Sequence, residues 1–326
     1  MIDIQEFSAP VAAEMQECRR QYDALLHHEN AYLHEILAFV AEYKGKMLRP
    51  LLTLLCGKLV GRVTPATLST ALAIELFHTA SLLHDDIVDE SDERRAGRSV
   101  NAAFGNKSAV LVGDYLLATA LLCVARTQDA RLTTLLSVCA QQMTDGELLQ
   151  LRNAQLMNNN SSEEDYFRVI ERKTAALFAV CAESAALCGG ADEEECARLR
   201  TFGLNVGICF QLKDDILDYV GTPALGKPTG KDLMEGKVTL PLLYALRQGG
   251  AGEVEHLLSR VKSAELTREE AAQLIDFACR HGGILYAREV MNRYALQAKE
   301  AIAPFFGSDS HTALVRFVDY VVSRIR

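Results

Sequence analysis

The sequence contains no tryptophan, only seven prolines in 326 residues, and no two cysteines in a CxxC pair. Its nine cysteines are scattered, mostly among Ala, Leu and Val. This pattern indicates that the cysteines are small buried hydrophobic side chains in a reducing compartment, not disulfides or zinc ligands. With so few prolines and 49% hydrophobic residues, the composition is that of an ordinary globular protein and excludes a disordered chain.

Basic residues are also in deficit, because 34 lysines and arginines face 43 aspartates and glutamates and leave a net charge of −9. Binding to nucleic acid or to anionic lipid needs a broad basic surface, so we expect neither partner. The N-terminal stretch MIDIQEFSAPVAAEMQE lacks the basic residues and the apolar segment of a signal peptide. The longest apolar run, at 108–125, carries Asp114 near its middle and predicts a core helix. We therefore expect a cytoplasmic protein without a stable membrane anchor.

Alternating strand-like runs are scarce, whereas apolar residues recur every three or four positions, as at Leu68, Leu72 and Leu76. We expect an all-α fold without a sheet. No shift in composition marks a boundary, so residues 1–326 are predicted to form a single domain. Clusters of glycine, proline and asparagine predict breaks between helices at 57–65, 95–106, 158–162, 189–194, 221–236, 249–252, 282–283 and 307–310.

Two acidic clusters, HDDIVD at 84–89 and DDILD at 214–218, interrupt apolar helices. Positions i and i+4 share a helix face, so the first and last aspartates of each cluster point the same way. The middle aspartates, Asp86 and Asp215, are turned by about 100° toward an outer layer of the site. One acidic patch is usually a solvated surface, but two converging clusters in apolar surroundings need a cation to neutralise them. Oxygen ligands suit Mg²⁺. The predicted metal ligands are Asp85, Asp86, Asp89, Asp214 and Asp218.

A site that holds a diphosphate on a metal also needs cations, and the chain supplies them near both clusters. Arginine suits bidentate phosphate binding, and a proline in the first turn favours the helix that GKMLRP begins. A lone basic residue is usually a surface charge, so the prediction rests on the combination. The candidates are Lys46, Arg49, Arg94, Arg95, Lys173 next to Thr174, Lys227, Lys231 and Lys237.

Taken in order, these segments resemble the trans-isoprenyl diphosphate synthases, in particular the long-chain octaprenyl type, over most of the chain. The matching pieces are GKMLRP, ELFHTASLLHDDIVDESDERR, NAAFGNKSAVLVGDYLLA, GELLQL, the KT of ERKTAALF, FQLKDDILDY and GKPTGKDLMEGKVTLPLL. The resemblance implies a helical bundle of the isoprenoid synthase type around a central cavity, and a homodimer. It also implies about three Mg²⁺ ions per active site, as oxygen ligation allows. The implied reaction condenses isopentenyl diphosphate with an allylic diphosphate, for quinone side chains.

The resemblance also assigns residues to two diphosphate sites. Isopentenyl diphosphate would be held by Lys46, Arg49, His78 and Arg95. The allylic diphosphate would be held through Mg²⁺ on Asp85, Asp89 and Asp214, with direct contacts from Arg94, Lys173, Thr174, Gln211 and Lys231. The implied catalytic residues are Asp85, Asp89, Lys173 and Asp214. His78 could instead be a capped histidine of the core. Two segments, Lys44-Gly45-Lys46 and Arg95-Ala96-Gly97, lack a glycine that the family usually carries, which puts the loop geometry there in question.

The chemistry explains why such groups are needed. A diphosphate becomes a good leaving group when cations take up the charge that develops as its C–O bond breaks. Water would react with the allylic carbocation that remains, which accounts for the apolar walls. By resemblance, oxygens of Thr174 and Gln211 help to stabilise this cation before isopentenyl diphosphate attacks it. No side chain stands out as a base, so the departing diphosphate is expected to accept the proton.

Product length should depend on the residues upstream of Asp85. Ala80 and Ser81 lie about one helical turn below the metal and are small, whereas the family places bulky aromatics there when the product is short. Phe77 lies one further turn down and either forms a lower floor or packs into the next helix. The room along this helix predicts a product of about six to ten isoprene units, with octaprenyl as the central expectation.

Other functions fit part of the pattern. A helical metal-dependent phosphohydrolase could use His78, His84 and Asp85, but it has no need of the second acidic cluster. A terpene cyclase shares the first cluster but normally carries Asn and Ser or Thr at its second metal site. A noncatalytic subunit of a heteromeric synthase is the strongest alternative, although such subunits tend to lose one cluster. The apolar run at 108–125 is a candidate dimer interface as well as a core helix.

Overall fold

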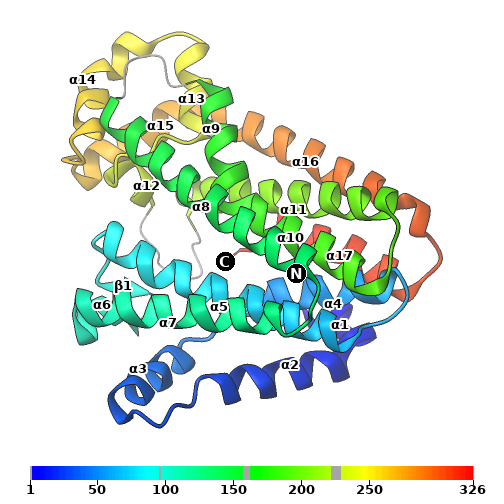
Figure 1. Ribbon diagram of the computed structural model, residues 1–326. Coiled ribbons are helices and arrows are strands. Elements are labelled where there is room, and N and C mark those ends of the chain that lie inside the picture. The colour runs from blue at the N-terminus through cyan, green and yellow to red at the C-terminus, as the bar shows by residue number, and fades with distance from the viewer. Residues whose placement is uncertain (1, 95–96, 157–161, 222–228, 326) are drawn as a thin grey trace.

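The computed structural model describes residues 2–94, 97–156, 162–221 and 229–325, and these are almost entirely helical (Figure 1). The first half comprises α1 (Gln5–Ser8), the 3₁₀ turn η1 (Ala9–Val11), α2 (Ala12–Leu25), α3 (Ala31–Glu42), α4 (Leu48–Leu59), α5 (Pro65–Val88), β1 (Glu93–Arg94), β2 (Gly97–Arg98), α6 (Val100–Phe104), α7 (Asn106–Ala125) and α8 (Ala130–Leu156). The second half comprises α9 (Glu163–Ile170), the π-helical turn η2 (Glu171–Ala175), α10 (Ala176–Gly189), α11 (Glu193–Val220), α12 (Lys231–Met234), α13 (Leu240–Arg247), α14 (Ala251–Lys262), α15 (Arg268–Arg280), α16 (Gly283–Ala301), the 3₁₀ turn η3 (Ala303–Phe305) and α17 (Asp309–Ser323). The expected all-α fold is confirmed.

Local capping explains where the longest helices begin. At the start of α5, the Thr64 hydroxyl accepts the Thr67 N–H and the Thr67 hydroxyl accepts the Thr64 N–H, with Pro65 between them. Asp192 and Glu195 make the same reciprocal pair of bonds at the start of α11. The predicted breaks at 57–65, 189–194, 249–252, 282–283 and 307–310 all fall where one helix gives way to the next.

The expectation of no sheet is wrong in one detail. The two-residue strands β1 and β2 pair in antiparallel register, with Glu93 opposite Arg98 and Arg94 opposite Gly97. Strands this short cannot show the alternation by which a sequence reveals a strand. The predicted break at 221–236 likewise contains α12, a helix of four residues.

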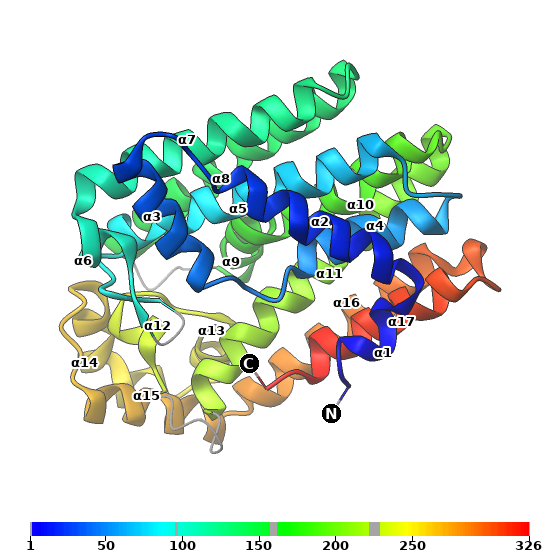
Figure 2. The ribbon, with the colours of Figure 1, turned by 90° about the horizontal axis from the view of Figure 1, so that it is seen from below.

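The helices pack in layers around α5, α10 and α11. α5 lies against α4, α7 and α10, while α11 lies between α10 and α16 (Figure 1). α10 is apolar around its whole circumference, which is typical of a helix enclosed by others, and ten of its residues are buried. Seen from below, α2 crosses the layer of α5 and α7, and α17 ends close to α11 (Figure 2).

Two apolar clusters stabilise the chain. The larger one extends through α2, α4, α5, α7, α10, α11, α16 and α17. The smaller one joins the end of α11 to α12, α13, α14 and α15, and includes Tyr219, Leu233 and Phe277. Seven of the nine free cysteines are buried as expected, whereas Cys188 is half-buried and Cys279 is exposed. The single-domain organisation stays a prediction.

α5 and α7 are each long and apolar enough to cross a membrane, judged by length and composition alone. α5 lies inside the bundle, but α7 is only partly covered. Its inner face buries Val112, Leu116 and Ala120, whereas Leu111 and Leu122 on the outer face are 67% and 57% exposed. The predicted core helix at 108–125 is therefore a core helix on one face only.

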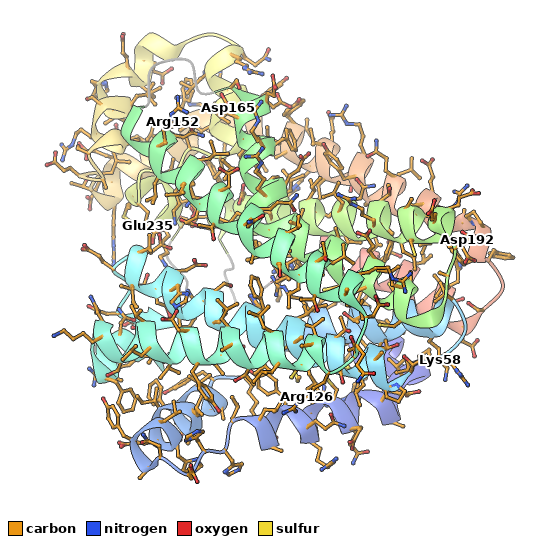
Figure 3. All side chains as sticks on the ribbon, in the orientation of Figure 1. Lys58, Arg126, Arg152, Asp165, Asp192 and Glu235 are labelled. Atoms are coloured by element: carbon orange, nitrogen blue, oxygen red, sulfur yellow. The ribbon has the colours of Figure 1, made fainter. Side chains whose placement is uncertain are left out.

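Both acidic clusters lie at the same end of the bundle. α5 and α11 run in the same direction, so their C-terminal turns meet on the side where Glu235 is found (Figure 3). Lys58, in the last turn of α4, and Asp192, at the start of α11, mark the opposite end (Figure 3). The fold thus brings together two segments that lie far apart in the sequence.

Candidate active site

The last turn of α5 carries the first aspartate cluster. Asp89 caps the helix, and its backbone N–H donates to the carbonyl of Asp85 at 2.8 Å. Asp85 and Asp89 are half-buried on a common face, whereas Asp86 is only 3% exposed. The helical spacing therefore leaves the outer two carboxylates of this cluster accessible and turns the middle one inward.

The environment of Asp85 disfavours the charged form of its carboxyl. Burial raises the pKa of its carboxyl to about 6; the Lys173 ammonium opposes this shift, while the carboxylates of Glu147 and Asp89 add to it. Lys173 is itself ion-paired with Glu147. A partly buried carboxylate among other carboxylates gains most from an additional cation. The predicted role of Asp85 as a metal ligand is compatible with this environment.

Asp86 is held by Arg94 of the β1–β2 hairpin. The Arg94 Nε donates to both oxygens of Asp86, at 2.8 and 3.0 Å, and its Nη2 donates to Oδ1. This bidentate pair compensates a buried charge and attaches the hairpin to α5. Gly97 allows β2 to lie against the Tyr43 ring, where a Cβ would overlap it. Asp86 and Arg94 therefore form an ion pair with each other. The other predicted arginine of this loop, Arg95, lies outside the described residues.

The second cluster, near the end of α11, divides its carboxylates among three environments. Asp214 is half-buried and pairs with Arg324, whose Nη2 lies 2.8 Å from Oδ1. Asp218 accepts the backbone N–H groups of Lys231 and Asp232, at 3.0 and 3.1 Å, and so caps α12. Burial raises the pKa of the Asp218 carboxyl, and these N–H groups oppose the shift. Of the two predicted metal ligands here, Asp214 pairs with a side chain, whereas Asp218 accepts backbone N–H groups.

Asp215 is almost fully buried, at 2% exposure, and accepts two hydrogen bonds. The Tyr166 hydroxyl donates to Oδ2 at 2.6 Å, and the Gln211 amide donates to Oδ1 at 2.8 Å. Gln211 in turn accepts the hydroxyl of Thr174 at 2.8 Å. Burial raises the pKa of Asp215 to about 7, although both hydrogen bonds lower it. The predicted contacts Thr174 and Gln211 are thus linked to the second acidic cluster.

Lys173 and Thr174 lie in η2, a π-helical turn between α9 and α10. Single π turns are frequent at functional sites because they displace side chains from the regular helical positions. Two glycines bring neighbouring helices close to this turn. A Cβ at Gly146 of α8 would lie 2.8 Å from the Lys173 nitrogen, and one at Gly207 of α11 would lie 2.5 Å from the Ala175 Cα. Close packing against η2 therefore explains the glycine of the GELLQL segment.

A short segment joins the two clusters across the site. α12 starts on the Asp218 carboxylate, and a few residues later the Lys237 ammonium lies 3.3 and 3.4 Å from the two oxygens of Asp89. Lys237 also donates to Glu235 at 2.8 Å. Burial lowers the pKa of Lys237, but Glu235 and Asp89 outweigh it and raise the pKa overall. Lys237 is therefore a charged ammonium between the clusters, whereas the predicted Lys231 is exposed and pairs with Glu235.

A cavity of about 160 Å³ opens beside these groups. Its polar lining includes side chains of η2, α11, α12 and the segment that follows α12: Lys173, Thr174, Gln211, Asp215, Asp232 and Lys237. Burial and the nearby Asp215 and Asp218 carboxylates raise the pKa of Asp232 well above its usual range. The cavity thus holds cations, hydroxyl and amide groups next to several carboxylates.

The predicted isopentenyl site lies beside α17. The Lys46 ammonium donates to the Tyr320 hydroxyl at 2.8 Å, and the Arg49 guanidinium lies 4.8 Å from the ring centroid of Phe178. As Pro50 suggested, Arg49 lies in the first turn of α4. One turn beyond Tyr320, the Arg324 guanidinium lies over the Phe210 ring at 3.9 Å. Three cations therefore gather where α4, α11 and α17 meet.

His78 lies on a neighbouring surface of α5. It lines a smaller cavity of about 60 Å³ with Gly45, Asp86, Arg94 and other residues. The structure therefore brings His78 close to the Lys44–Lys46 loop and the Asp86–Arg94 pair.

Comparison with known proteins gives the family of the chain. The family model described as Polyprenyl synthetase matches residues 30–277. The chain belongs to the polyprenyl synthetase family. It is an enzyme, a prenyltransferase.

Three relatives show the breadth of that family. The octaprenyl diphosphate synthase of Haemophilus influenzae is 34% identical over 99% of this chain and 98% of its own. The crystal structure of a polyprenyl synthase from Caulobacter crescentus, complexed with calcium and isoprenyl diphosphate, covers 99% and 98% of the two chains with a TM-score of 0.93 and 33% identity. A geranylgeranyl pyrophosphate synthase from Bacteroides thetaiotaomicron covers 98% of each chain, with a TM-score of 0.85 and 43% identity. These relatives differ in the product length that their names give.

Two of the three residues predicted to set chain length in this polyprenyl synthetase are buried on α5. Ala80 is 2% exposed and Phe77 is 6% exposed, and both belong to the larger apolar cluster. The half-buried Ser81 donates its hydroxyl to the His78 carbonyl at 2.9 Å, so its polar atom is satisfied within the helix. Neither possibility for Phe77, a channel floor or ordinary packing, is decided by its burial.

Several site residues of this family member were missed in the sequence. Arg324, Tyr166 and Glu147 each pair with a residue noted in the sequence. Glu147 lies in the GELLQL segment but was given no role, whereas the segments around Arg324 and Tyr166 carry no other chemical signal. Lys237 was noted only as one of several lysines. An arginine near the end of an apolar helix is ordinarily a surface charge. Only the position of Arg324 beside Asp214 in the folded chain indicates that it belongs to the site.

The donor set fits a hard divalent cation. Within the described ranges, no three His, Cys, Asp or Glu side chains converge closely enough to enclose a metal by themselves. Mg²⁺ typically takes one or two protein carboxylates and completes its shell with water and phosphate oxygens, so the dispersed carboxylates are compatible with it. Asp85, Asp89 and Asp214 are half-buried, and a cation would compete with Lys237 for Asp89 and with Arg324 for Asp214. Asp86 is instead buried against Arg94, and Asp218 is bound by backbone N–H groups.

Proposed function

We propose that this prenyltransferase condenses isopentenyl diphosphate onto an allylic diphosphate and makes a long all-trans polyprenyl diphosphate for quinone side chains. The observation that carries the proposal is the meeting of the two acidic clusters at one end of the bundle, joined by Lys237. A diphosphate bound there would face accessible carboxylates on both sides and basic side chains between them.

In this proposal, Mg²⁺ held by Asp85, Asp89 and Asp214 supplies charge neutralisation for the leaving diphosphate. Lys173 and Lys237 donate to its oxygens, and Arg94 does so if it exchanges Asp86 for the substrate. These cations would take up negative charge as the C–O bond breaks, which is the electrostatic contribution that such leaving groups need. The buried apolar residues of α5 exclude water from the carbocation that forms.

The second diphosphate is assigned to the cations between α4 and α17. Lys46 and Arg49 already lie together there, and Arg324 adds a third positive charge. A diphosphate bound to this group would hold isopentenyl diphosphate beside the η2 turn. His78 and Arg95 stay candidate contacts of the same substrate.

The length of the product is the most detailed part of the proposal. Ala80 and Ser81 offer little bulk one turn below Asp85, so a growing chain could pass them along α5. We therefore keep octaprenyl as the expected product, within a range of about six to ten units set by the space along this helix. The relatives named for octaprenyl products support this range, whereas the geranylgeranyl synthase shows that the same fold also makes shorter products.

We further propose that two copies of the chain pair through the outer face of α7. Leu111 and Leu122 are exposed there with Val110 and Leu121, and Val138 of α8 continues the apolar surface. Contiguous apolar surface of this kind usually marks an association site. Pairing of identical surfaces in a symmetric dimer would cover it in both copies.

A product assay tests the function. Purified protein would be incubated with farnesyl diphosphate, isopentenyl diphosphate and Mg²⁺, and the dephosphorylated products sized by chromatography and mass spectrometry. A single long polyprenol whose formation depends on Mg²⁺ is the expected result. No elongation would contradict the proposal and favour a noncatalytic subunit of a heteromeric synthase.

A further inference from the structure

We propose that Tyr166 is a positioning residue that orients the Thr174 hydroxyl through Asp215 and Gln211. This inference rests on the proposed function, because it concerns how the site faces an allylic cation. Tyr166 lies on α9 and is 8% exposed, so its hydroxyl is inside the protein. It reaches Thr174 only by way of α11, which carries both intervening side chains.

The four side chains form an unbroken line of hydrogen bonds. Tyr166 donates to Asp215 at 2.6 Å, Gln211 donates to the other Asp215 oxygen at 2.8 Å, and Thr174 donates to the Gln211 carbonyl at 2.8 Å. Among the described residues, Tyr166 and Gln211 are the two side chains that donate to Asp215. At 2% exposure, Asp215 has little access to water as a replacement donor.

The direction of this line is fixed by chemistry. The Gln211 amide turns its NH₂ toward Asp215 and its oxygen toward Thr174, and the ionised form of Asp215, which can only accept, favours this orientation. The Thr174 hydroxyl then donates its single hydrogen to the Gln211 oxygen. Its lone pairs are left for other neighbours, and Thr174 lines the cavity with Lys173. A hydroxyl oxygen presented in this sense stabilises positive charge, whereas a rotated hydroxyl would present its hydrogen and oppose it.

Tyr166 is needed because hydrogen bonds in a line reinforce one another in a low-dielectric interior. Without its phenol, Asp215 keeps one donor and is free to rotate about its remaining bond to Gln211. The amide of Gln211 then loses its fixed orientation, and the Thr174 hydroxyl loses the acceptor that directs its hydrogen. Tyr166 also lines the cavity, but its hydroxyl donates to Asp215, so it would influence bond breaking through the orientation of Thr174.

The test compares Tyr166→Phe with Tyr286→Phe in the full-length enzyme. Tyr286 is the matched control because its phenol donates to Glu163 of the same helix α9, at 2.7 Å, outside the line. Single-turnover condensation of farnesyl diphosphate with isopentenyl diphosphate is measured over a range of both substrates. We expect Tyr166→Phe to lower the rate about tenfold and to leave the half-saturating concentrations within about twofold, since it removes an interaction that matters only as charge develops. Tyr286→Phe should retain the wild-type rate.

A double-mutant comparison makes the test specific. In a Thr174→Val background there is no hydroxyl to orient, so adding Tyr166→Phe should reduce the rate little further. Independent, multiplying losses would overturn the inference, as would a wild-type rate for Tyr166→Phe or an equal loss for Tyr286→Phe. If Tyr166→Phe does not fold, Tyr166→His, which keeps an N–H donor, should be faster than Tyr166→Leu, and equal rates would overturn it. An inactive wild-type protein would refute the proposed function and this inference with it.

Discussion

Replacing Ala80 with phenylalanine should shorten the product while leaving the protein nearly as stable as before. Ala80 lies five residues before Asp85, about 7.5 Å along the axis of α5, and Phe77 lies about 12 Å from it on the same scale. If a growing chain passes Ala80, the added ring occupies channel space and stops elongation early. In that case the ring would enter a channel that is empty without substrate, and its effect on folding should be small.

The opposite arrangement has a calculable consequence. If Ala80 is instead packed against protein, a phenyl ring overfills the core at a cost of about 1–3 kcal/mol. With about 2.1 cal/mol/K of unfolding entropy per residue, the 326 residues of the chain lose about 1.5 °C of melting temperature for each kcal/mol, so the loss would be about 1.5–4.5 °C. The channel hypothesis predicts a loss smaller than about 1 °C on the same scale.

Ala71 provides the matched control. It lies nine positions earlier on α5, which places it about 180° around the helix, and it is fully buried. Ala71→Phe should therefore lower the melting temperature and leave the product length unchanged. Products would be sized by mass spectrometry, and melting would be followed by calorimetry. An unchanged product with a large loss of stability in Ala80→Phe would refute the assignment of Ala80 to the channel.

Four further predictions follow from the same geometry. Asp85→Asn and Asp214→Asn should each lower kcat by at least about 100-fold without changing the melting temperature, because they remove charge from the accessible carboxylates rather than from the core; near wild-type turnover would remove their assignment to the metal. Burial raises the pKa of the Asp85 carboxyl to about 6, so this group is mostly neutral below that pH. At limiting Mg²⁺, kcat/KM should therefore rise as the pH increases through about 6. With excess Mg²⁺, the midpoint of this rise should move to lower pH. Leu111→Glu combined with Leu122→Glu should convert a dimer to monomers in analytical ultracentrifugation, whereas the equally exposed Leu296→Glu on α16 should not. Titration calorimetry should show that Mg²⁺ and inorganic pyrophosphate each bind more tightly in the presence of the other, and independent affinities would speak against a shared site.

The long helices could be predicted from the sequence because their start and stop signals are local. Thr64 with Pro65 and Asp192 with Glu195 start helices through bonds among neighbouring residues, so no tertiary information is needed. The hairpin at 93–98 and the four-residue helix α12 were missed for the converse reason. α12 starts on the side chain of Asp218, which precedes it by more than ten residues. Its cap is a tertiary contact.

The candidate site divides in the same way. The outward direction of Asp85 and Asp89 and the inward turn of Asp86 and Asp215 follow from the helical period alone. The partners of these carboxylates do not. Asp86 is neutralised by a loop arginine, whereas Asp215 is held by a tyrosine from a different helix. Helical spacing indicates which groups face inward, but only the packing of helices decides what they meet there.

One arrangement of the site emerges only from these partners. Four of the cations proposed to bind diphosphate are paired with a carboxylate of the same site: Lys173 with Glu147, Arg94 with Asp86, Lys237 with Asp89, and Arg324 with Asp214. A cation taken up by Asp89 or Asp214 would weaken the hold of that carboxylate on its basic partner and so release the partner for an anion. An anion bound to the basic side chain would release the carboxylate in the same manner. Because such coupling is reciprocal, metal and diphosphate should favour each other's binding through an exchange of ion-pair partners. The protein keeps its charges compensated without substrate, which limits the cost of holding several carboxylates together in an apolar bundle.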